Sequence, residues 1–378
     1  MTDEHHDDRP CSPGSRRAAN ATGARWRRAG ALLAASVLVL GAAACGGDDQ
    51  DAGSGGDDAP ATVRLLTYDS FALPEEAAAA FTERTGAEIE VVANGDSGSM
   101  LAGALLAAGN PEADVIFGID NTSATRATDG DLLDPVDPPS ASEVPERYQL
   151  PGDQRDLLVP IDSGDVCMNL DTEWFEESGT PVPTTLEQLT EPTYRDLTVV
   201  SSPVTSSPGM ALLIGTVDRY GEEGWQDFWA RLRDNGVRVR PSWDDAYYTD
   251  YTVSGGDRPI VLSYASSPPV ELIFSEGERT EPASAVLEDS CSAQVEYAGV
   301  LRGTDRPELA AELVDFMLSD EWQRELPLTN FVFPVMDVEL PREFVDWAVQ
   351  AESPMGLSPD VVDAGRDGWI EAWREQME

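Results

Sequence analysis

The chain has 378 residues, of which 70 are acidic and 25 basic, and its formal net charge is −45 at pH 7. Every basic residue is an arginine, since the sequence contains no lysine. Contacts to phosphate groups need cations, so this composition excludes nucleic acid and anionic lipid surfaces as partners. The charge favours a cationic ligand by long-range attraction, and it also suits a surface adapted to a saline or alkaline exterior.

The first 44 residues are typical of a secretory leader. Five arginines between positions 16 and 28 precede an apolar stretch over residues 29–40, which is too short to span a bilayer. Small residues follow and end at Cys45, in the sequence GAAAC. This arrangement resembles a lipobox, so we predict a lipoprotein signal peptide over residues 1–44 and lipidation of Cys45. An ordinary signal peptide that is cut nearby is the alternative.

Residues 45–61 are rich in glycine and aspartate and contain almost no apolar side chains. Such a segment cannot bury a core, so we predict a flexible tether. The lipid would then be the chain's only attachment to the membrane and would hold the folded part at the outer face of the cell. Without the leader, 66 acids and 19 arginines remain, for a net charge of −47.

Histidine and cysteine limit the chemistry of the mature chain. Both histidines lie at positions 5 and 6, within the predicted leader, which excludes Ser-His-Asp and Cys-His catalysis and histidine-bound zinc. Cys11 leaves with the leader and Cys45 takes the lipid. Cys167 and Cys291 remain, in an oxidising compartment. We predict that these two form a disulfide, with two free thiols as the alternative.

The first part of the body alternates strands with helices. An apolar strand is predicted over residues 61–68, a helix over 74–86, a second strand over 87–94 and a second helix over 97–111. The run ADVIFGID at 113–120 is continuously apolar, as in a strand buried on both faces. This alternation predicts an α/β domain with a mostly parallel sheet.

A second domain is predicted to interrupt the first. Two apolar runs within residues 156–171 are split by Asp162-Ser163-Gly164-Asp165, which we interpret as the crossing into it, and residues 293–301 as the return. The predicted fold is a two-lobed α/β protein, with lobe 1 over residues 62–162 and 295–378 and lobe 2 over 163–294. Further elements are a strand at 197–203, helices at 207–221 and 222–236, a strand at 258–268, one helix at 305–326, and closing helices at 341–350 and 359–376.

Aromatic, hydroxyl and acidic side chains gather at the predicted strand ends. Ligands of α/β sheets bind beyond the carboxyl ends of strands, so side chains from two facing lobes converge on one cleft. Aromatic faces bind flat rings and cations, and a helix N-terminus binds an anion. The set suits a flat, cationic, aromatic ligand with a polar or phosphorylated tail. Its members are Tyr68, Asp69, Asp120, Asn121, Ser206, Ser207, Trp243, Tyr247, Tyr264 and Phe331.

From residue 63 to the end, the chain resembles the periplasmic thiamine-binding proteins of ABC importers, which have the type II, Venus-flytrap fold. The resemblance rests on TYDSF, ADVIFGIDN, VTSSPGMALL, SWDDAY, PIVLSYASSP, FPV and GWIEAWREQ, in the family's order and spacing. It implies a monomeric binding protein without cofactor or metal, which takes up thiamine or its phosphates. Its partners would be a membrane permease and a cytoplasmic ATPase.

The resemblance also implies roles for single residues. Tyr68 would lie near the thiazolium ring, and Trp243 and Tyr264 would wall the ring system. The hydroxyethyl or phosphate end would meet Asp120, Asn121 and the Ser206–Ser207 loop. Phe331, in LTNF, stands where the family has the tryptophan of TGNW; it is smaller and lacks the indole N–H. For the aromatic residues the alternative is core packing, and for Asp120, Ser206 and Ser207 it is helix capping.

Two rival functions follow from other patterns in the sequence. Adjacent Tyr247 and Tyr248 resemble the paired tyrosines of ferric-ion binders of the same fold, with Tyr251 nearby. A secreted carboxylate-dependent hydrolase would need a pair such as Asp244 and Asp245, but neighbouring side chains tend to point apart. The match to SWDDAY favours the thiamine type over both, so we do not expect an enzyme.

Overall fold

The computed structural model describes residues 60–275 and 277–377. The predicted signal peptide, Cys45 and the tether up to residue 59 lie outside the described residues. Within this part of the chain, none of the helices is long and apolar enough to cross a membrane.

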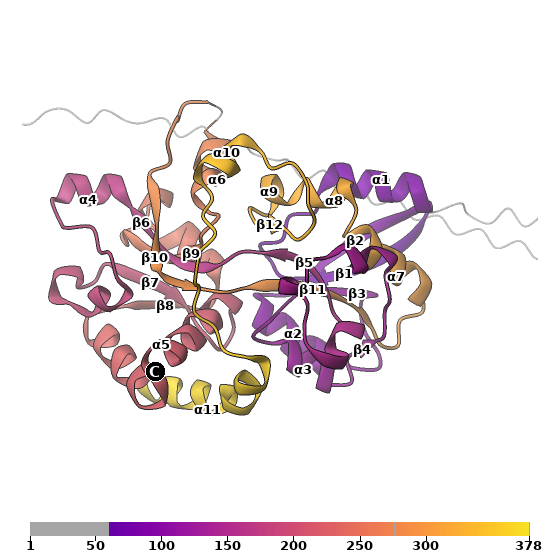
Figure 1. The fold of residues 1–378 in the computed structure, drawn as a ribbon, viewed down its shortest axis with the longest axis horizontal. Helices are drawn as coiled ribbons and strands as arrows, with labels where there is room; N and C mark the ends of the chain where they lie inside the picture. The colour runs from indigo at the N-terminus through magenta and orange to yellow at the C-terminus, as the bar shows by residue number, and fades with distance from the viewer. Residues whose placement is uncertain (1–59, 276, 378) are drawn as a thin grey trace, which may run out of the picture. The chain divides into compact units, whose positions relative to one another are not determined.

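Two β-sheets form the centres of two lobes (Figure 1). Lobe 1 contains a seven-stranded sheet with the order β12-β5-β11-β3-β1-β2, in which β4 pairs with β11. Lobe 2 contains a five-stranded sheet with the order β10-β6-β9-β7-β8. The strands of the first sheet are β1 (Ala61–Thr67), β2 (Ala87–Ala93), β3 (Val115–Asp120), β4 (Leu133–Asp134), β5 (Val159–Ser163), β11 (Val295–Leu301) and β12 (Phe333–Pro334). Those of the second are β6 (Val166–Asp171), β7 (Thr198–Ser201), β8 (Arg238–Arg240), β9 (Ile260–Tyr264) and β10 (Ser284–Ser292).

The helices follow the predicted pattern in most places. Those that belong to lobe 1 are α1 (Glu75–Thr85), α2 (Ser97–Leu106), α3 (Ala124–Asp129), α7 (Pro307–Phe316), α8 (Asp320–Gln323) and α9 (Leu326–Thr329). The helices that pack in lobe 2 are α4 (Thr172–Ser178), α5 (Ser207–Asp234), α6 (Pro268–Phe274), α11 (Pro359–Met377) and a π-helix, η6 (Asp245–Asp250). Helix α10 (Arg342–Trp347) packs against α6 of lobe 2, while its Phe344 ring meets Phe333 of β12 in lobe 1. Short 3₁₀ helices are η1 (Pro139–Glu143), η2 (Glu146–Tyr148), η3 (Gly152–Asp156), η4 (Leu186–Thr190), η5 (Pro192–Tyr194) and η7 (Thr252–Ser254).

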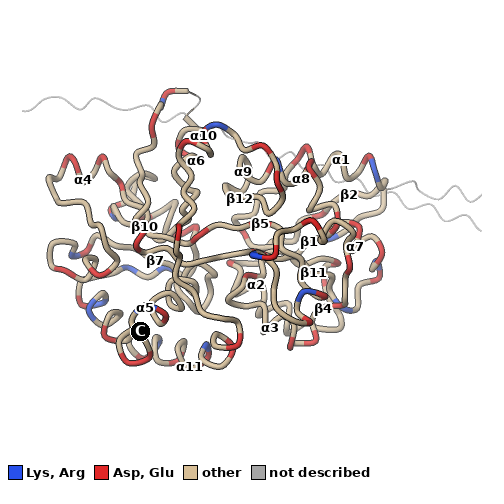
Figure 2. The backbone as a smooth tube through the Cα atoms, in the orientation of Figure 1, with Lys and Arg blue, Asp and Glu red and all other residues tan. Residues whose placement is uncertain are grey.

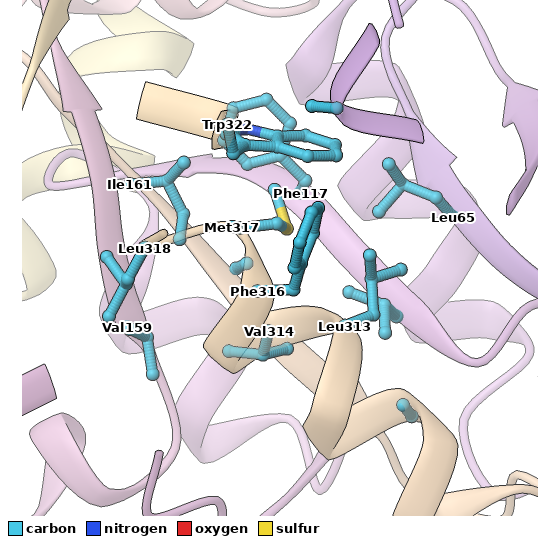
Figure 3. Packing of buried hydrophobic residues seen from close by; sticks show 14 of the residues in the cluster. Leu65, Phe117, Val159, Ile161, Leu313, Val314, Phe316, Met317, Leu318 and Trp322 are labelled. Atoms are coloured by element: carbon cyan, nitrogen blue, oxygen red, sulfur yellow. The ribbon is translucent and has the colours of Figure 1, made fainter. Parts of the chain in front are cut away.

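The middle of the first sheet is buried on both faces. Every residue of β3 is buried, as its apolar run predicts, and β1 pairs in parallel with β2 and β3. Helices α7 and α8 supply Phe316 and Trp322 to the core (Figure 3). The ring of Phe81 of α1 packs against Phe316, with the ring centroids 5.3 Å apart. Burying a large apolar side chain stabilises a fold by about 1.5–3 kcal/mol, so this cluster holds the sheet and its helices together.

Acidic residues are spread over the backbone of both lobes, with far fewer arginines among them (Figure 2). The acidic residues are therefore distributed along the described chain and are not confined to one lobe.

The chain passes from the first sheet to the second between β5 and β6 and returns between β10 and β11. These are the two places where the sequence predicts crossings. Cys167 on β6 and Cys291 on β10 form a disulfide beside them, which is the pairing that the sequence predicts. Both cysteines are buried, against Ala265.

A third crossing differs from the predicted lobe boundary, which placed all residues after 295 in lobe 1. Between α10 and α11 the chain returns to lobe 2, where Met355, Trp369 and Trp373 join the core of that lobe. The Trp373 ring lies 5.7 Å from Trp229 of α5, edge to face. The amphipathic pattern of residues 359–376 predicts the helix correctly, but it does not say which sheet receives the apolar face.

Two helical segments are interrupted, one by a helix cap and one by a glycine. The single helix predicted over residues 305–326 is interrupted, because Ser319 caps α8 by accepting a hydrogen bond from the Trp322 N–H. In α5 the two predicted helices meet at Gly221, whose φ of 69° and ψ of 174° break the helical geometry. The chain therefore changes direction at both positions.

Candidate functional site

A cavity of about 210 Å³ lies between side chains of the two lobes. Lobe 2 contributes most of its aromatic rings, and lobe 1 contributes a tyrosine, a carboxyl group and the segment that follows α9. It is lined by Tyr68, Ser70, Ala72, Trp243, Tyr247, Tyr248, Tyr264, Ser267, Val270, Phe274, Glu296, Thr329, Asn330, Phe331 and Val332.

The aromatic wall on the lobe 2 side is built around Trp243. Its ring stacks on Tyr247 at 4.9 Å and lies 6.1 Å from the tilted ring of Tyr264. Its indole N–H donates to the Ser263 hydroxyl at 3.1 Å, which fixes the ring plane. Tyr248 meets the same indole edge to face at 5.5 Å. These rings present flat faces of the kind that hold aromatic or cationic groups.

The π-helix η6 positions two of these rings and is held in place by ion pairs. Asp250, at its end, accepts hydrogen bonds from Arg238 at 2.6 Å and from Arg240 at 2.8 Å, both on β8. The hydrogen bond from Arg240 is the main cause that lowers the pKa of Asp250. Wide π-helical turns are rare and occur often at functional sites. Here the turn places Tyr247 and Tyr248 on the cavity.

On the lobe 1 side, Tyr68 follows the end of β1. Its ring lies over Gly118 of β3, where a Cβ atom would come within 2.4 Å of the ring and where φ is 98°. Its hydroxyl donates to Glu296 Oε2 at 2.9 Å, and Gln294 donates to Glu296 Oε1 at 3.3 Å. Burial is the main cause that raises the pKa of Tyr68 and Tyr264 well above the usual value.

Phe331 lines the cavity close to Phe274 of lobe 2. Their rings meet edge to face at 5.6 Å. Phe331 has a φ of 56°, which is rare for a residue other than glycine and costs about 1–3 kcal/mol. The adjacent Asn330 anchors this segment, because its side chain bonds both the N–H and the carbonyl oxygen of Ala72 at 3.0 and 2.9 Å.

Three of the predicted residues lie at a direct contact between the lobes and do not line the cavity. The Ser207 hydroxyl donates to Asp120 Oδ2, and the Ser207 N–H donates to Ser97 Oγ at 3.1 Å. The Ser206 hydroxyl donates to Ser201 at 2.9 Å within lobe 2. The N-terminal end of α5 therefore meets the N-terminal end of α2.

Two further contacts join the lobes at the same place. Asp96, which caps α2, accepts a hydrogen bond from the Trp243 N–H at 2.9 Å. Gly98 lies so close to lobe 2 that a Cβ atom would stand 2.7 Å from the Thr205 carbonyl oxygen. These contacts connect the aromatic wall directly to lobe 1.

The remaining two predicted residues also lie away from the cavity. Asp69 is exposed and accepts from the Gly95 N–H at 3.0 Å. The Asn121 side chain accepts from the Val295 N–H at 2.9 Å and donates to the Ala293 carbonyl at 3.3 Å, so it fixes the return crossing. Of the ten predicted residues, the structure brings together at the cavity Tyr68, Trp243, Tyr247, Tyr264 and Phe331.

Glu296 is the charged cavity residue that sequence reasoning missed, and Phe274 is an aromatic one. Glu296 is 4% exposed and stands in QVEY, inside an otherwise apolar strand. An acid at such a position is unusual in a buried strand, and this is the signal that could have identified it.

For the ferric-ion rival, Tyr247 and Tyr248 both line the cavity and Tyr251 is buried. Burial is the main cause that raises the pKa of Tyr247 and Tyr251 in the metal-free protein. Among the described residues, no three histidine, cysteine or acidic side chains form a group that could hold a metal ion without tyrosine ligands. Neither Asp244 nor Asp245 lines the cavity.

Comparisons with known proteins agree with this architecture. A model of the bacterial extracellular solute-binding protein family matches residues 110–349. The thiamine-binding periplasmic protein of Salmonella typhimurium is 30% identical over 320 residues, which cover 83% of this chain and 93% of that protein.

Solved structures show the same fold. A periplasmic thiamin binding protein superimposes with a TM-score of 0.73 at 27% identity, over 84% of this chain and 96% of that one. Iron-bound HitA from Pseudomonas aeruginosa gives a TM-score of 0.67 at 18% identity, over 84% and 99%. The predicted two-lobed α/β fold of type II binding proteins is confirmed.

Proposed function

Because the chain belongs to the family of bacterial extracellular solute-binding proteins, we propose that it captures thiamine or a thiamine phosphate for import. Two relatives support this ligand: the Salmonella typhimurium protein and the solved thiamin binding protein, which resemble this chain over most of their length. The bound form would be recognised by a membrane permease driven by an ATPase. The protein would act as a receptor without a reaction of its own.

The observation that carries the proposal is the composition of the cavity. Seven aromatic side chains, five from lobe 2 and two from lobe 1, surround a space whose polar lining includes the buried acid Glu296. Thiamine combines a flat aminopyrimidine with a cationic thiazolium ring. Stacking suits the first, and aromatic faces together with a carboxyl group suit the second.

Capture requires that the lobes separate and close again. The contacts between Ser207 and Asp120 and between Trp243 and Asp96 stabilise the closed arrangement. In this arrangement the aromatic wall and Tyr68 line the same cavity. We propose that a ligand enters when these few polar contacts open, and that closure buries its rings.

The experiment that tests the function is isothermal titration of the purified protein, freed of bound ligand by unfolding and refolding. We expect one thiamine to bind per chain, and a parallel titration with thiamine monophosphate would show which form is preferred. A refolded protein that binds neither compound would contradict the proposal. Ferric ion is then the next candidate, and a visible tyrosinate absorbance band would reveal it.

The sequence GAAAC at residues 41–45 supports a lipid anchor on the outer face of the cell membrane. We propose that the thioether lipid on Cys45 is the attachment of this receptor. Labelled palmitate is expected to enter the wild-type protein in growing cells and not the Cys45→Ala variant. Equal labelling of both would contradict the anchor.

A further inference from the structure

Three buried acids form a row across the sheet of lobe 1. In the antiparallel ladders, Glu296 of β11 lies opposite Asp120 of β3 on one side and opposite Asp162 of β5 on the other. Their exposed fractions are 4%, 1% and 1%. Side chains of directly opposed residues share one face of a sheet, and like charges in such pairs are destabilising. Such a row of buried acids therefore needs hydrogen-bond donors or positive charges to stabilise it.

The three acids differ in the number of hydrogen bonds that their carboxyl groups accept. Asp120 accepts from the hydroxyls of Thr122 and Ser123 at 2.7 and 2.8 Å, and also from Ser207. Glu296 accepts from Tyr68 and Gln294. Neither carboxyl oxygen of Asp162 has a hydrogen-bond partner. The row thus becomes less well satisfied from β3 to β5.

No positive charge neutralises this row within residues 60–275 and 277–377. None of the arginines there forms an ion pair with any of its three acids, although Asp250 alone has two. Arg366 of α11 lies near enough for Asp120 to influence its pKa, which burial lowers. The titratable groups near Glu296 are Asp96, Asp120, Asp162, Tyr68 and Tyr264, and all of these are acids or phenols.

Burial makes the charged forms of Glu296 and Asp162 unfavourable. It raises the pKa of Glu296 to about 8, and the pKa of Asp162 is raised by burial and by the neighbouring charge of Glu296. A buried carboxyl without a counter-ion takes up a proton instead of staying charged. Glu296 is also the member of the row that lines the aromatic cavity.

We infer that Glu296, backed by Asp162, is the counter-ion for a cationic ring in this cavity, and that capture of the cation expels a proton from the pair. This inference rests on the proposed function and adds to it the group that recognises the charge. The proton balance is simple: the O–H bond of the Glu296 carboxyl breaks, its electron pair stays on the oxygen, and the proton passes to solvent. The carboxylate then faces the ligand's positive charge, and no covalent bond to the ligand forms.

An organic cation fits this site better than a metal ion. Among the described residues, no three histidine, cysteine or acidic side chains form a group that could hold a metal ion, and seven aromatic side chains with a single carboxyl group, that of Glu296, line the cavity. A diffuse positive charge on a flat ring can stack on Trp243 or Tyr264 within the cavity that Glu296 lines.

The affinity for the cation is expected to depend on pH. In the free protein Glu296 is protonated below about pH 8, because burial raises its pKa to about 8. A bound cation stabilises the carboxylate and lowers that pKa. Between the lowered value and about pH 8, binding releases up to one proton, so affinity rises by up to tenfold per pH unit. Above about pH 8 the affinity levels off.

The test is calorimetric titration of the protein with thiamine from about pH 6 to pH 9, in pairs of buffers with different ionisation enthalpies. We expect wild type to release close to one proton per thiamine near pH 7. Glu296→Gln keeps the acceptor for Tyr68 but cannot ionise. It is expected to bind at least tenfold more weakly than wild type at pH 8.5, with a flat pH profile and no proton release.

Glu88→Gln is the matched control, because it makes the same charge change at an exposed position on β2. It should behave as wild type. Thiamine binding by wild type without proton release would overturn the inference and leave the proposed function intact. No binding by wild type at any pH would overturn both. Because proton release is measured on the wild-type protein, the test does not depend on how the variant folds.

Discussion

Replacing Cys167 and Cys291 together with serine is expected to lower the free energy of unfolding by about 3–5 kcal/mol. The bond joins residues 124 positions apart, and a long closed loop restricts the unfolded chain strongly. Both sulfur atoms belong to residues that are at most 1% exposed, so two serine hydroxyls would also be buried in an apolar cluster. Urea unfolding followed by tryptophan fluorescence measures the change.

The position of the bond explains why the neighbouring strands do not replace it. The ladder between β10 and β6 is interrupted between Leu287 and Ser292, and Cys291 lies in this interruption. A double alanine variant separates the loss of the cross-link from the burial of hydroxyl groups. If the free energy of unfolding of both double variants lies within about 1 kcal/mol of wild type, the disulfide does not constrain the unfolded chain.

Short-range patterns in the sequence were sufficient for most elements and for both inner crossings. The continuous apolar run of β3 predicts a strand buried on both faces, and Gly86 after α1 predicts the left-handed turn that the structure has there, with a φ of 76°. Such signals depend on residues that are close together in the chain, so one sequence is enough to read them.

Long-range pairing accounts for what the sequence did not reveal. Asp120, Asp162 and Glu296 are far apart in the chain and meet only because β11 pairs with both β3 and β5. Nothing local specifies that register. The placement of α11 on lobe 2 has the same cause, because the apolar face with Trp369 and Trp373 suits either lobe.

The candidate site was likewise predicted only in part from the sequence. Aromatic side chains at strand ends were predicted to converge, and those of Tyr68, Trp243 and Tyr264 do so. The serines at the start of α5 were assigned to the ligand's polar end, but Ser207 bonds Asp120 across the lobes. A hydroxyl group at a helix N-terminus serves a ligand, a cap or another lobe with the same geometry, so sequence alone cannot distinguish these uses.

Replacing Trp243 with alanine is expected to weaken thiamine binding at least ~30-fold, or about 2 kcal/mol, because one residue makes three contributions to the cavity. Its face stacks on Tyr247, its edge meets Tyr248, and its ring borders Tyr264. Truncation removes one wall and the hydrogen bond from the indole N–H to the Ser263 hydroxyl. The other rings then lose the neighbour that fixes their orientation. Titration calorimetry with thiamine measures the loss.

Trp174→Ala is the matched control for this prediction. Trp174 is half-buried on α4, packs edge to face on Phe175 at 5.1 Å and does not line the cavity. Both variants lose an indole from lobe 2, so a general loss of stability would affect both. We expect only Trp243→Ala to lose affinity, with the backbone contact from position 243 to Asp96 retained, because alanine keeps the N–H. Equal affinities in the two variants would show that the ligand does not stack on this wall, and the cavity would have to be reassigned.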